Sequence, residues 1–339
     1  MAKSKVEDGA ELSVVDAFKN NLVGKLGAGI KKSFIDPLNI VYERFPSGSY
    51  LLDDELKGGY VKGKHVELFG NEATGKSTLC AEAVTQFQKK YPKEMVMWFD
   101  LENVLDGEYF NNIGVNINPD KFILMRPDTG EEVFEMIREF AKSFKGGLII
   151  IDSVPLMVPE TTMEADFNQA NVAAQARLMS KGMEGVMAHL SKADTTVFFI
   201  NQLRTNIGNM YGDQNVTKGG NALKYYVRTR IKTSRQNSKG VAGESSGNTF
   251  ELVKANYGNE KKKVETRIVY GQGIDKISEL IDFCEKIKLF EKSGSWFSYK
   301  GTKLANGKNA FIDVLRDNVE LYEELEEVVR THIKEKYEK

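Results

Sequence analysis

The residues Gly70-Asn71-Glu72-Ala73-Thr74-Gly75-Lys76-Ser77 form a glycine-rich loop of the pattern G-x-x-x-x-G-K-[ST]. An apolar stretch typical of a strand, residues 66–69, precedes the loop, and a stretch typical of a helix, residues 78–90, follows it. This order favours phosphate binding, because loop N–H groups and the positive end of the helix dipole face the same anion. The sequence therefore predicts a nucleotide-binding α/β domain. A glycine turn with a chance lysine is the less favoured alternative.

The residue types in the loop indicate how a nucleotide would be held. The Lys76 ammonium is expected to reach the β- and γ-phosphates, and the Ser77 hydroxyl is expected to hold Mg²⁺. Gly70 and Gly75 let backbone N–H groups turn toward the phosphates without an intervening Cβ. ATP and Mg²⁺ are the predicted cofactors.

Composition agrees with a soluble enzyme. The chain has 339 residues, of which 41% are hydrophobic, enough for a large core in about two domains, or in one large domain with small additions. No apolar run approaches the ~20 residues of a membrane span, and the charged N-terminus does not resemble a secretory signal. Cys80 and Cys284 lie far apart, which argues against a disulfide framework or metal cluster and favours a reducing cytoplasm. The net charge of −1 means that any nucleic-acid site must come from charges gathered locally.

Hydrophobic patterning divides the chain into three parts. Residues 11–26 have helical spacing, which fits a helix packed on its own core or on a neighbour. From about residue 45 to residue 272, strand-like and helical stretches alternate, which predicts a mostly parallel sheet covered on both faces. The predicted strands are residues 66–69, 95–99, 122–125, 148–151, 197–200, 227–232, 249–254 and 265–270. The last three alternate apolar and polar residues, so we expect them to be antiparallel and half exposed.

The third part follows Gly273 and is charged and rich in helix formers. Residues 296–301, Trp-Phe-Ser-Tyr-Lys-Gly, predict a hairpin within it. We therefore expect an N-terminal helix arm over residues 1–44, an ATPase core over 45–273 and a small C-terminal α/β domain over 274–339.

Polar side chains follow three of the predicted strands, where open α/β sheets place ligands. Asp152 ends a buried strand and would hold Mg²⁺ through water, with Ser153 in support. Glu102 is the candidate that orients and deprotonates the attacking water, with a solvated loop acid as the alternative. Gln202, in the pair Asn201-Gln202, is the candidate that senses the γ-phosphate.

Two polar segments and a basic stretch point to a second binding surface. Residues 160–171 and 203–220 are too polar to be buried, and the second is long enough for a functional mobile loop. Between residues 214 and 243 there are seven Lys or Arg and no Asp or Glu, which would attract a phosphate backbone. A solvated basic face is the alternative. The helix after the first loop carries an apolar stripe that indicates core packing: Leu178, Met179, Gly182, Met183, Val186 and Leu190.

Over about residues 45–300 the chain resembles the bacterial RecA recombinases. The segments that carry the resemblance are Pro46-Ser47-Gly48-Ser49, residues 70–78, Asp100-Leu101-Glu102-Asn103-Val104-Leu105-Asp106, Arg126-Pro127-Asp128-Thr129-Gly130-Glu131, Gln175-Ala176-Arg177-Leu178-Met179-Ser180, Phe199-Ile200-Asn201-Gln202-Leu203-Arg204 and Gly219-Gly220-Asn221-Ala222-Leu223-Lys224. The resemblance implies a RecA-type core that forms filaments on single-stranded DNA, hydrolyses ATP and catalyses homologous pairing and strand exchange, with duplex DNA as a second partner.

The resemblance also implies roles for individual residues. Glu102, Lys76, Gln202 and Lys254 would be catalytic, and Ser77 and Asp152 would hold the metal. Thr78, Asp106, Tyr109, Tyr270 and Gly271 would join the phosphate loop in binding ATP, with Tyr109 stacked on adenine. DNA would be bound by Arg177, Arg204, Asn206, Gly208, Lys218, Gly219 and Gly220, and the protomer interface would include Tyr225, Lys254 and Asn256.

Some positions depart from the family pattern. The family places two lysines across the protomer interface on the nucleotide, and here the matching positions are Lys254 and Asn256. Asn206 stands where a basic residue is common, residues 1–44 match poorly, and the acidic C-terminal tail is missing. Such departures suit a divergent or virus-encoded member. Two alternatives are a ring-forming motor or helicase on the same core, and a single-strand-binding scaffold that uses ATP only as a structural ligand.

Overall fold

The computed structural model describes residues 13–36, 40–163, 172–205, 215–217, 219–220, 222–236 and 244–337. The chain divides into two compact units, Met1–Tyr42 and Glu43–Lys339. In the first unit, α1 (Val14–Leu26) begins at Ser13, whose hydroxyl accepts the Asp16 N–H, and η1 (Ala28–Ser33) follows. The predicted N-terminal helix is thus confirmed, but none of its residues is buried. Its apolar residues Val15 and Phe18 are exposed, so among the described residues of this unit the helix packs on no core.

The second unit is built on one large sheet with the strand order β12-β11-β10-β9-β3-β7-β6-β4-β5. The strands of this sheet are β3 (Val66–Gly70), β4 (Val96–Asp100), β5 (Phe122–Met125), β6 (Leu148–Asp152), β7 (Thr196–Thr205), β9 (Thr229–Gln236), β10 (Ser245–Ala255), β11 (Lys263–Val269) and β12 (Gly273–Ile274). The pairs from β9 through β5 are parallel, which confirms the predicted α/β fold. A small antiparallel pair, β1 (Arg44–Phe45) and β2 (Tyr60–Val61), precedes the sheet.

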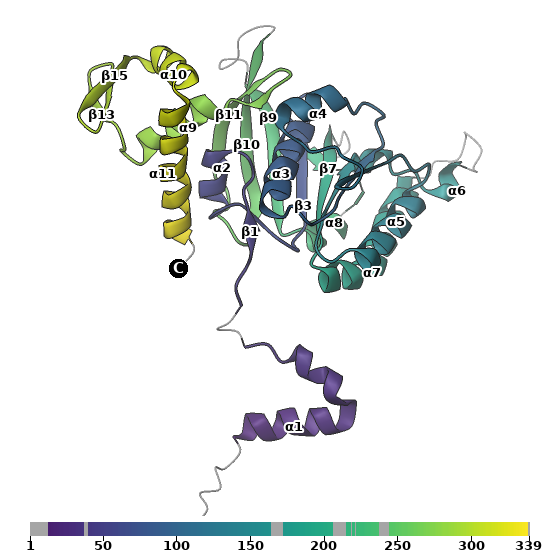
Figure 1. Cartoon of the computed structure of the whole chain (residues 1–339). Helices are drawn as coiled ribbons and strands as arrows, with labels where there is room; N and C mark the ends of the chain where they lie inside the picture. Colours follow the sequence, from purple (N-terminus) through teal and green to yellow (C-terminus); the bar gives the residue numbers. More distant parts are fainter. Residues whose placement is uncertain are drawn as a thin grey trace, which may run out of the picture. The chain divides into compact units, whose positions relative to one another are not determined.

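Helices cover both faces of this sheet (Figure 1). On one face, α3 (Lys76–Lys90) and α4 (Gly107–Ile113) pack through residues such as Val84 and Phe110. On the other face, α5 (Gly130–Ser143) and α7 (Val172–Ala193) enclose a second core. The predicted stripe on α7 is core, with Met179 and Met183 fully buried, and Gly182 admits the Phe134 ring. Apolar side chains project from both faces of the parallel strands, so both faces of the sheet must be covered by helices.

The three C-terminal strands of the sheet differ in part from the prediction. β9 begins at Thr229 and pairs with β3 in parallel, so only its pairing with β10 is antiparallel. β10 is longer than predicted and mostly buried, whereas β11 alternates as expected. The alternation in the sequence misled the prediction, because polar residues of β10 such as Asn248 bond inside the molecule.

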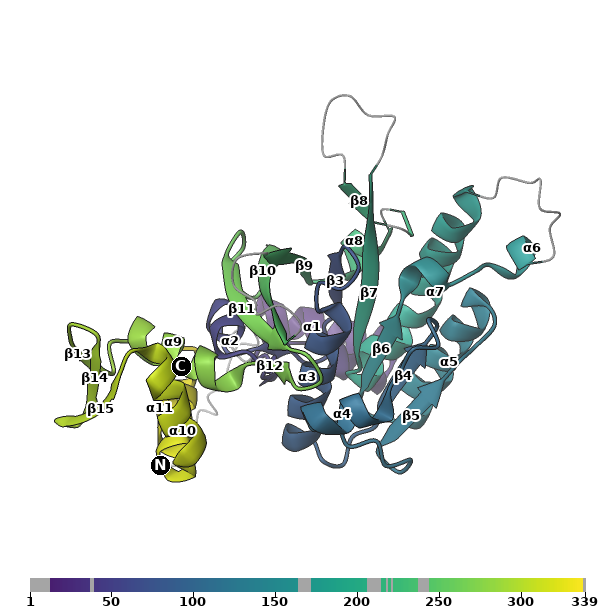
Figure 2. The same ribbon diagram turned by 90° about the horizontal axis from the view of Figure 1, so that it is seen from above.

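The segment predicted as a loop from residue 203 contains a paired strand. β7 continues to Thr205 and pairs with β8 (Asn215–Thr217) in antiparallel register, Leu203 opposite Thr217. Figure 2 shows this two-stranded stem extending beyond the rest of the sheet. α8 (Ala222–Tyr226) follows. In the other polar segment, α6 (Glu160–Met163) replaces part of the predicted loop and follows η3 (Val154–Leu156). Residues 164–171 and 206–214 lie outside the described part of the chain.

The C-terminal elements pack beside α2 (Tyr50–Glu55) and have a core of their own (Figure 2). They are α9 (Lys276–Lys286), β13 (Glu291–Ser293), β14 (Trp296–Tyr299), β15 (Thr302–Asn306), α10 (Lys308–Asp317) and α11 (Val319–Tyr337). β14 and β15 form the predicted hairpin. The buried Asp54 carboxylate of α2 accepts hydrogen bonds from Lys286, Lys336 and Tyr337 at 2.7–2.9 Å, which fixes the end of α11.

A buried carboxylate, Glu279 of α9, joins these elements to α2. Its two oxygens accept the Ser49 hydroxyl at 2.9 Å and the Tyr50 N–H at 3.0 Å. Burial raises the pKa of Glu279 to about 7. Because this pKa lies above that of the unfolded chain, the group contributes stability that is complete at low pH and is lost as the pH rises through 7.

Glu279→Gln should remove this pH dependence. The glutamine oxygen can accept the Tyr50 N–H while its amide donates to Ser49. We expect the free energy of unfolding of wild type, relative to the variant, to fall by up to ~3 kcal/mol between pH 4.5 and pH 8. Urea unfolding of both proteins across this range tests it. Parallel curves for the two proteins would contradict a raised pKa at Glu279.

Candidate active site

The glycine-rich loop joins β3 to α3 at the carboxyl end of the sheet. Gly75 has φ of 83°, in the left-handed region that glycine adopts without strain, and it directly precedes α3. A Cβ at Gly70 would collide with the carbonyl oxygen of Thr233 on β9, and one at Gly75 would collide with the Ile268 side chain. Thr74 fixes the loop from inside, since its hydroxyl lies 2.8 Å from the Asn71 carbonyl and 2.6 Å from the Thr233 hydroxyl. Gly70 is therefore required by close packing against the β9 backbone, and Gly75 by its left-handed backbone conformation.

Lys76 turns back over this loop. Its ammonium donates to the carbonyl oxygens of Asn71 at 2.6 Å and Gly70 at 3.3 Å, and the residue is buried. Burial lowers the pKa of Lys76, although the nearby carboxylates Asp152 and Glu102 act in the opposite direction. A cation held at a helix N-terminus by two carbonyls is placed where a phosphate would supply a stronger partner.

Asp152, at the end of β6, faces the first turn of α3. The Ser77 hydroxyl donates to Asp152 Oδ2 at 2.8 Å, and Asp152 is almost fully buried. Burial raises the pKa of Asp152 to about 6, and the neighbouring Glu102 and Asp100 contribute in the same direction. The described residues contain no cluster of three or more potential metal ligands. One carboxylate and one hydroxyl nevertheless suit Mg²⁺, which keeps several waters and takes further ligands from phosphates.

Glu102 lies on the segment after β4, and two contacts hold that segment. The Ser153 hydroxyl donates to Glu102 Oε1 at 2.8 Å, which links the segment to the end of β6. Asp100 accepts the N–H groups of Val104 and Leu105 at 3.1 and 3.3 Å, and it forms a two-nitrogen ion pair with Arg126. The sequence indicated Ser153 in support of Asp152, but not this anchoring by Asp100 and Arg126, because the pairing joins two different strands.

A cavity of about 550 Å³ opens beside these groups. Its lining includes five of the predicted nucleotide and metal residues, namely Ser77, Asp106, Tyr109, Asp152 and Gly271. Asp106 caps α4, and the Tyr109 hydroxyl lies 2.6 Å from the Thr78 hydroxyl, so the ring is tied to the phosphate loop. Tyr270 is half exposed and its hydroxyl accepts from Arg235 at 2.6 Å. The cavity has the size of a small-molecule site. Its lining carries the carboxylates of Asp100, Asp106, Glu108 and Asp152 and, among the described residues, no lysine or arginine, so positive charge for a phosphate would come from Lys76 of the adjoining loop.

Gln202 is brought next to the phosphate loop by strand pairing. β7 lies parallel to β3 with Gln202 opposite Gly70. Its neighbour Asn201 is fully buried, donates to Glu67 at 3.0 Å and accepts the Gln202 N–H at 2.9 Å. Of the predicted amide pair, Gln202 is therefore the one available to a ligand, and Asn201 holds its backbone. Gln202 also directly precedes Leu203–Thr205, the three residues of β7 that pair with β8.

The predicted DNA-binding residues are only partly described. Asn206, Gly208, Lys218 and the side chain of Arg204 lie outside the described residues. Gly219 has φ of 86° and lies against Met179 of α7, so the segment after β8 passes close to that helix. Gly220 packs against Ala176 in the same way. Within the basic stretch, Arg230 is committed to an ion pair with the buried Glu67 and is not a free surface charge.

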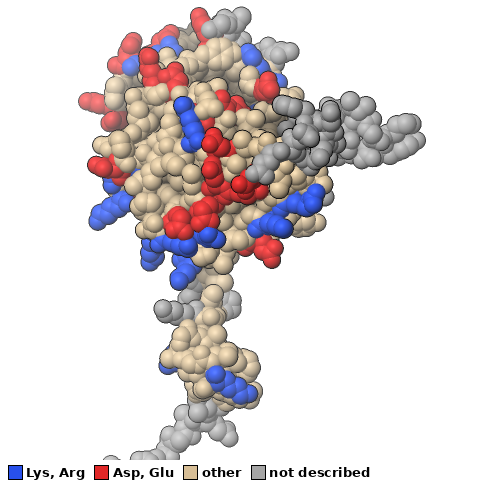
Figure 3. Space-filling model, turned by 90° about the vertical axis from the view of Figure 1, so that its right-hand side faces the viewer, with Lys and Arg blue, Asp and Glu red and all other residues tan. Residues whose placement is uncertain are grey.

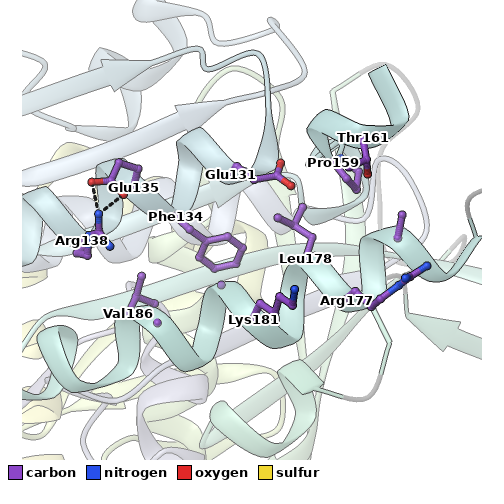
Figure 4. A pocket seen from close by; sticks show the side chains of 13 residues that line it. Glu131, Phe134, Glu135, Arg138, Pro159, Thr161, Arg177, Leu178, Lys181 and Val186 are labelled. Carbon is purple, nitrogen blue, oxygen red and sulfur yellow. Dashed lines mark hydrogen bonds and ion pairs between the residues drawn. The ribbon is translucent and has the colours of Figure 1, made fainter. Parts of the chain in front are cut away.

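Arg177 lines a second cavity, of about 610 Å³, between α5, α6 and α7. Figure 4 shows Arg177 and Lys181 on one side, Phe134 at the middle, and Arg138 paired with Glu135 on the other side. Acidic and basic side chains both gather on this face of the molecule (Figure 3). Although this cavity is larger than the one beside Ser77 and Asp152, it has no phosphate loop and its charges are partly paired.

The predicted interface residues lie on and beside α8. Tyr225 is 75% exposed, as expected of a residue that contacts another molecule. The Lys254 ammonium donates to the carbonyls of Lys224 and Val227, both at 2.8 Å, and so caps α8. Burial and the nearby Arg228 and Arg230 lower the pKa of Lys254. Asn256 is exposed, and its N–H donates to the Arg228 carbonyl at 3.1 Å.

Family profiles match most of the chain. The profile of the RecA N-terminal domain matches residues 18–275, and that of the RecA C-terminal domain matches residues 278–334. The chain belongs to the RecA family. Protein RecA of Mycoplasma mobile is 37% identical over 286 residues, 84% of this chain and 85% of the relative. Protein RecA of Francisella philomiragia is 34% identical over 332 residues, 97% of this chain and 89% of the relative.

Family membership confirms the sequence-based recognition and the predicted RecA-type core. The matched span of the first profile reaches into α1, a region whose sequence was expected to match poorly. The second profile begins within α9 and ends within α11. None of the described helices is both long and apolar enough to cross a membrane.

Proposed function

We propose that this protein is a DNA-dependent ATPase that assembles on single-stranded DNA and catalyses homologous pairing and strand exchange. RecA proteins are a recombinase family of homologous recombination and repair, and membership of that family favours this function over a helicase or a scaffold. The observation that carries the proposal is that Lys76, Glu102 and Asp152 lie near one another at the carboxyl ends of β3, β4 and β6, with Asp152 lining the cavity. A scaffold that only binds ATP would not need all three.

In the proposed reaction the residues divide the work of phosphoryl transfer to water. Lys76 leaves the loop carbonyls and pairs with the β- and γ-phosphates, where its charge offsets the charge of the transition state. Ser77 and Asp152 would hold Mg²⁺, which neutralises phosphate oxygens. Glu102, oriented by Ser153, accepts a proton from the attacking water. Gln202 contacts the γ-phosphate and transmits its presence along β7 to the DNA-binding stem.

The proposed function also requires contacts between protomers. Tyr225 and Lys254 belong to the surface that meets the next protomer, and Lys254 contacts the nucleotide held by that protomer's Lys76. Single-stranded DNA lies against Arg177, Gly219, Gly220 and the segment from Arg204 to Lys218. Residues 1–44 act as an arm between protomers, residues 45–273 as the ATPase core and residues 274–339 as a C-terminal domain. The exposed apolar side of α1 then has a partner in a neighbouring copy.

Arg204→Ala and Lys218→Ala should each weaken single-stranded DNA binding. Each phosphate contact that is lost should reduce the slope of log K against log salt by about 0.7. ATP affinity without DNA should change less than twofold, because neither residue belongs to the phosphate loop. Fluorescence anisotropy with labelled oligonucleotide at several salt concentrations measures the slope, and Lys142→Ala on α5 is the control. Unchanged slopes in both variants would move the DNA site elsewhere.

The proposed activity is tested by ATP hydrolysis with and without single-stranded DNA. We expect DNA to raise the rate per protomer, and electron microscopy of the same samples to show continuous protein filaments on the DNA. A rate that is insensitive to DNA, or rings in place of filaments, would reject the proposal in favour of a ring-forming motor.

A further inference from the structure

A group of cations lies at the end of the β9–β10 ladder. Lys254 is opposite Arg230, Ala255 is opposite Thr229, and the next step is the hydrogen bond from Asn256 N–H to the Arg228 carbonyl. Directly opposite residues of an antiparallel pair share a face, with Cβ atoms ~5 Å apart. The Ala255 side chain points into the core, so the side chains of Lys254 and Asn256 project from the opposite face of the sheet. Arg230 and Arg228, which lie opposite them, project from that same face.

The cations of this group are not equally neutralised. Arg230 is paired with the buried Glu67 at 2.5 Å and stacks on Phe69. Lys254 has two carbonyls but makes no ion pair in the described part of the chain. Arg228 is exposed, and its side chain reaches the Tyr225 carbonyl at 3.5 Å, at the limit of a hydrogen bond. Of the nearby carboxylates, Glu260 accepts the Ala255 N–H and its charge partly offsets that of Lys254, while Glu67 is paired with Arg230.

Burial and the nearby charge of Arg228 lower the pKa of Lys254, so these two cations lie close enough to repel each other. Arg228 itself lies opposite the uncharged Asn256. The Arg228 side chain is longer than the ~5 Å between opposed Cβ atoms, so its guanidinium can reach the position that a longer side chain at residue 256 would occupy. An anion that bound there would remove the repulsion, and a guanidinium can contact two phosphate oxygens at once.

We propose that Arg228 supplies, in place of Asn256, the second cation that reaches across to the triphosphate bound by the phosphate loop of an adjacent copy of this chain. The inference rests on the proposed function, in which Lys254 supplies the first. Asn256 has an amide that can donate hydrogen bonds but carries no charge. Arg228, directly before β9, and Lys254, near the end of β10, then form one phosphate-binding pair for the triphosphate of the adjacent copy.

The test is an exchange of charge between the two opposed positions. In Arg228→Ala, DNA-stimulated ATP turnover at saturating ATP should fall at least 10-fold, while ATP affinity without DNA stays within twofold of wild type. Adding Asn256→Lys to this variant should restore at least half of the wild-type turnover, and Arg228→Lys alone should keep most of it. Arg316→Ala, another exposed arginine, is the matched control. Thermal unfolding checks that each variant folds.

Mixing variants tests the contribution across the interface. Arg228→Ala mixed with Lys76→Ala should regain turnover that neither has alone, because some interfaces then combine an intact loop with an intact Arg228. Turnover of Arg228→Ala within twofold of wild type, a loss that Asn256→Lys does not restore, or no gain on mixing would each overturn the proposal. If wild type shows no DNA-stimulated turnover, that result rejects the proposed function itself and not only the role of Arg228.

Discussion

Lys76→Ala is expected to reduce ATP hydrolysis by on the order of 10²–10³-fold or more, because it removes the one cation of the phosphate loop. The buried ammonium makes hydrogen bonds only to loop carbonyls in the described structure, so phosphate is the partner for which its charge is placed. ATP turnover measured with saturating single-stranded DNA and Mg²⁺ checks this. A rate near that of wild type would reject the ATPase assignment of the loop.

The control for this variant is on the same helix. Lys89→Ala removes an exposed lysine near the end of α3 and should leave turnover unchanged. Lys76→Ala itself should fold normally, because it removes a cation whose burial already lowers its pKa. Thermal unfolding without nucleotide should therefore show no loss of stability. A strongly lowered melting temperature would mean that lost activity reports on folding instead.

Glu102→Gln should separate binding from chemistry. Glutamine can still accept the Ser153 hydroxyl at its side-chain oxygen, so the segment after β4 should keep its position. Without a carboxylate to accept a proton, hydrolysis should slow by roughly 10²–10⁴-fold, the usual contribution of a general base. Single-turnover hydrolysis and nucleotide binding, measured on the same preparation, check the two parts of the expectation.

The same variant should stay bound to DNA for longer. A filament that does not hydrolyse its ATP keeps the nucleotide that holds the filament together on DNA. Dissociation from labelled single-stranded DNA after a salt increase measures this lifetime. Glu139→Gln, which changes an exposed acid on α5, should match wild type in every assay. If Glu102→Gln loses nucleotide affinity in proportion to its activity, then Glu102 stabilises the pocket and is not the base.

Much of this site was predictable because its signals are local. The phosphate loop carries its own strand, glycines and helix start within about 25 residues, and the acids follow strands whose apolar runs are unmistakable. Parallel strands bring their carboxyl ends to one edge, so Glu102, Asp152 and Gln202 could be grouped from the order of strands along the chain. The family resemblance added specific roles that spacing alone does not give.

The features that could not be predicted are those that depend on which strands become neighbours in the sheet. β9 looked antiparallel from its alternation, but it lies between parallel β3 and antiparallel β10, and a strand carries no mark of its partners. The Asp100–Arg126 pair, the Lys254 cap on α8 and the place of Arg228 opposite Asn256 arise from such pairings. Basic residues from one stretch of sequence likewise have different surroundings in the structure, since Arg230 forms an ion pair with the buried Glu67.

The central claim, that this RecA-family protein pairs homologous DNA strands in an ATP-dependent way, is tested most directly by strand exchange between single-stranded DNA and a labelled duplex. With ATP and Mg²⁺, we expect wild type to transfer the labelled strand from a homologous duplex, and to leave a non-homologous duplex intact. Omission of ATP should abolish the transfer, as should Lys76→Ala. Separation of both duplexes irrespective of homology, or equal transfer without ATP, would contradict the account.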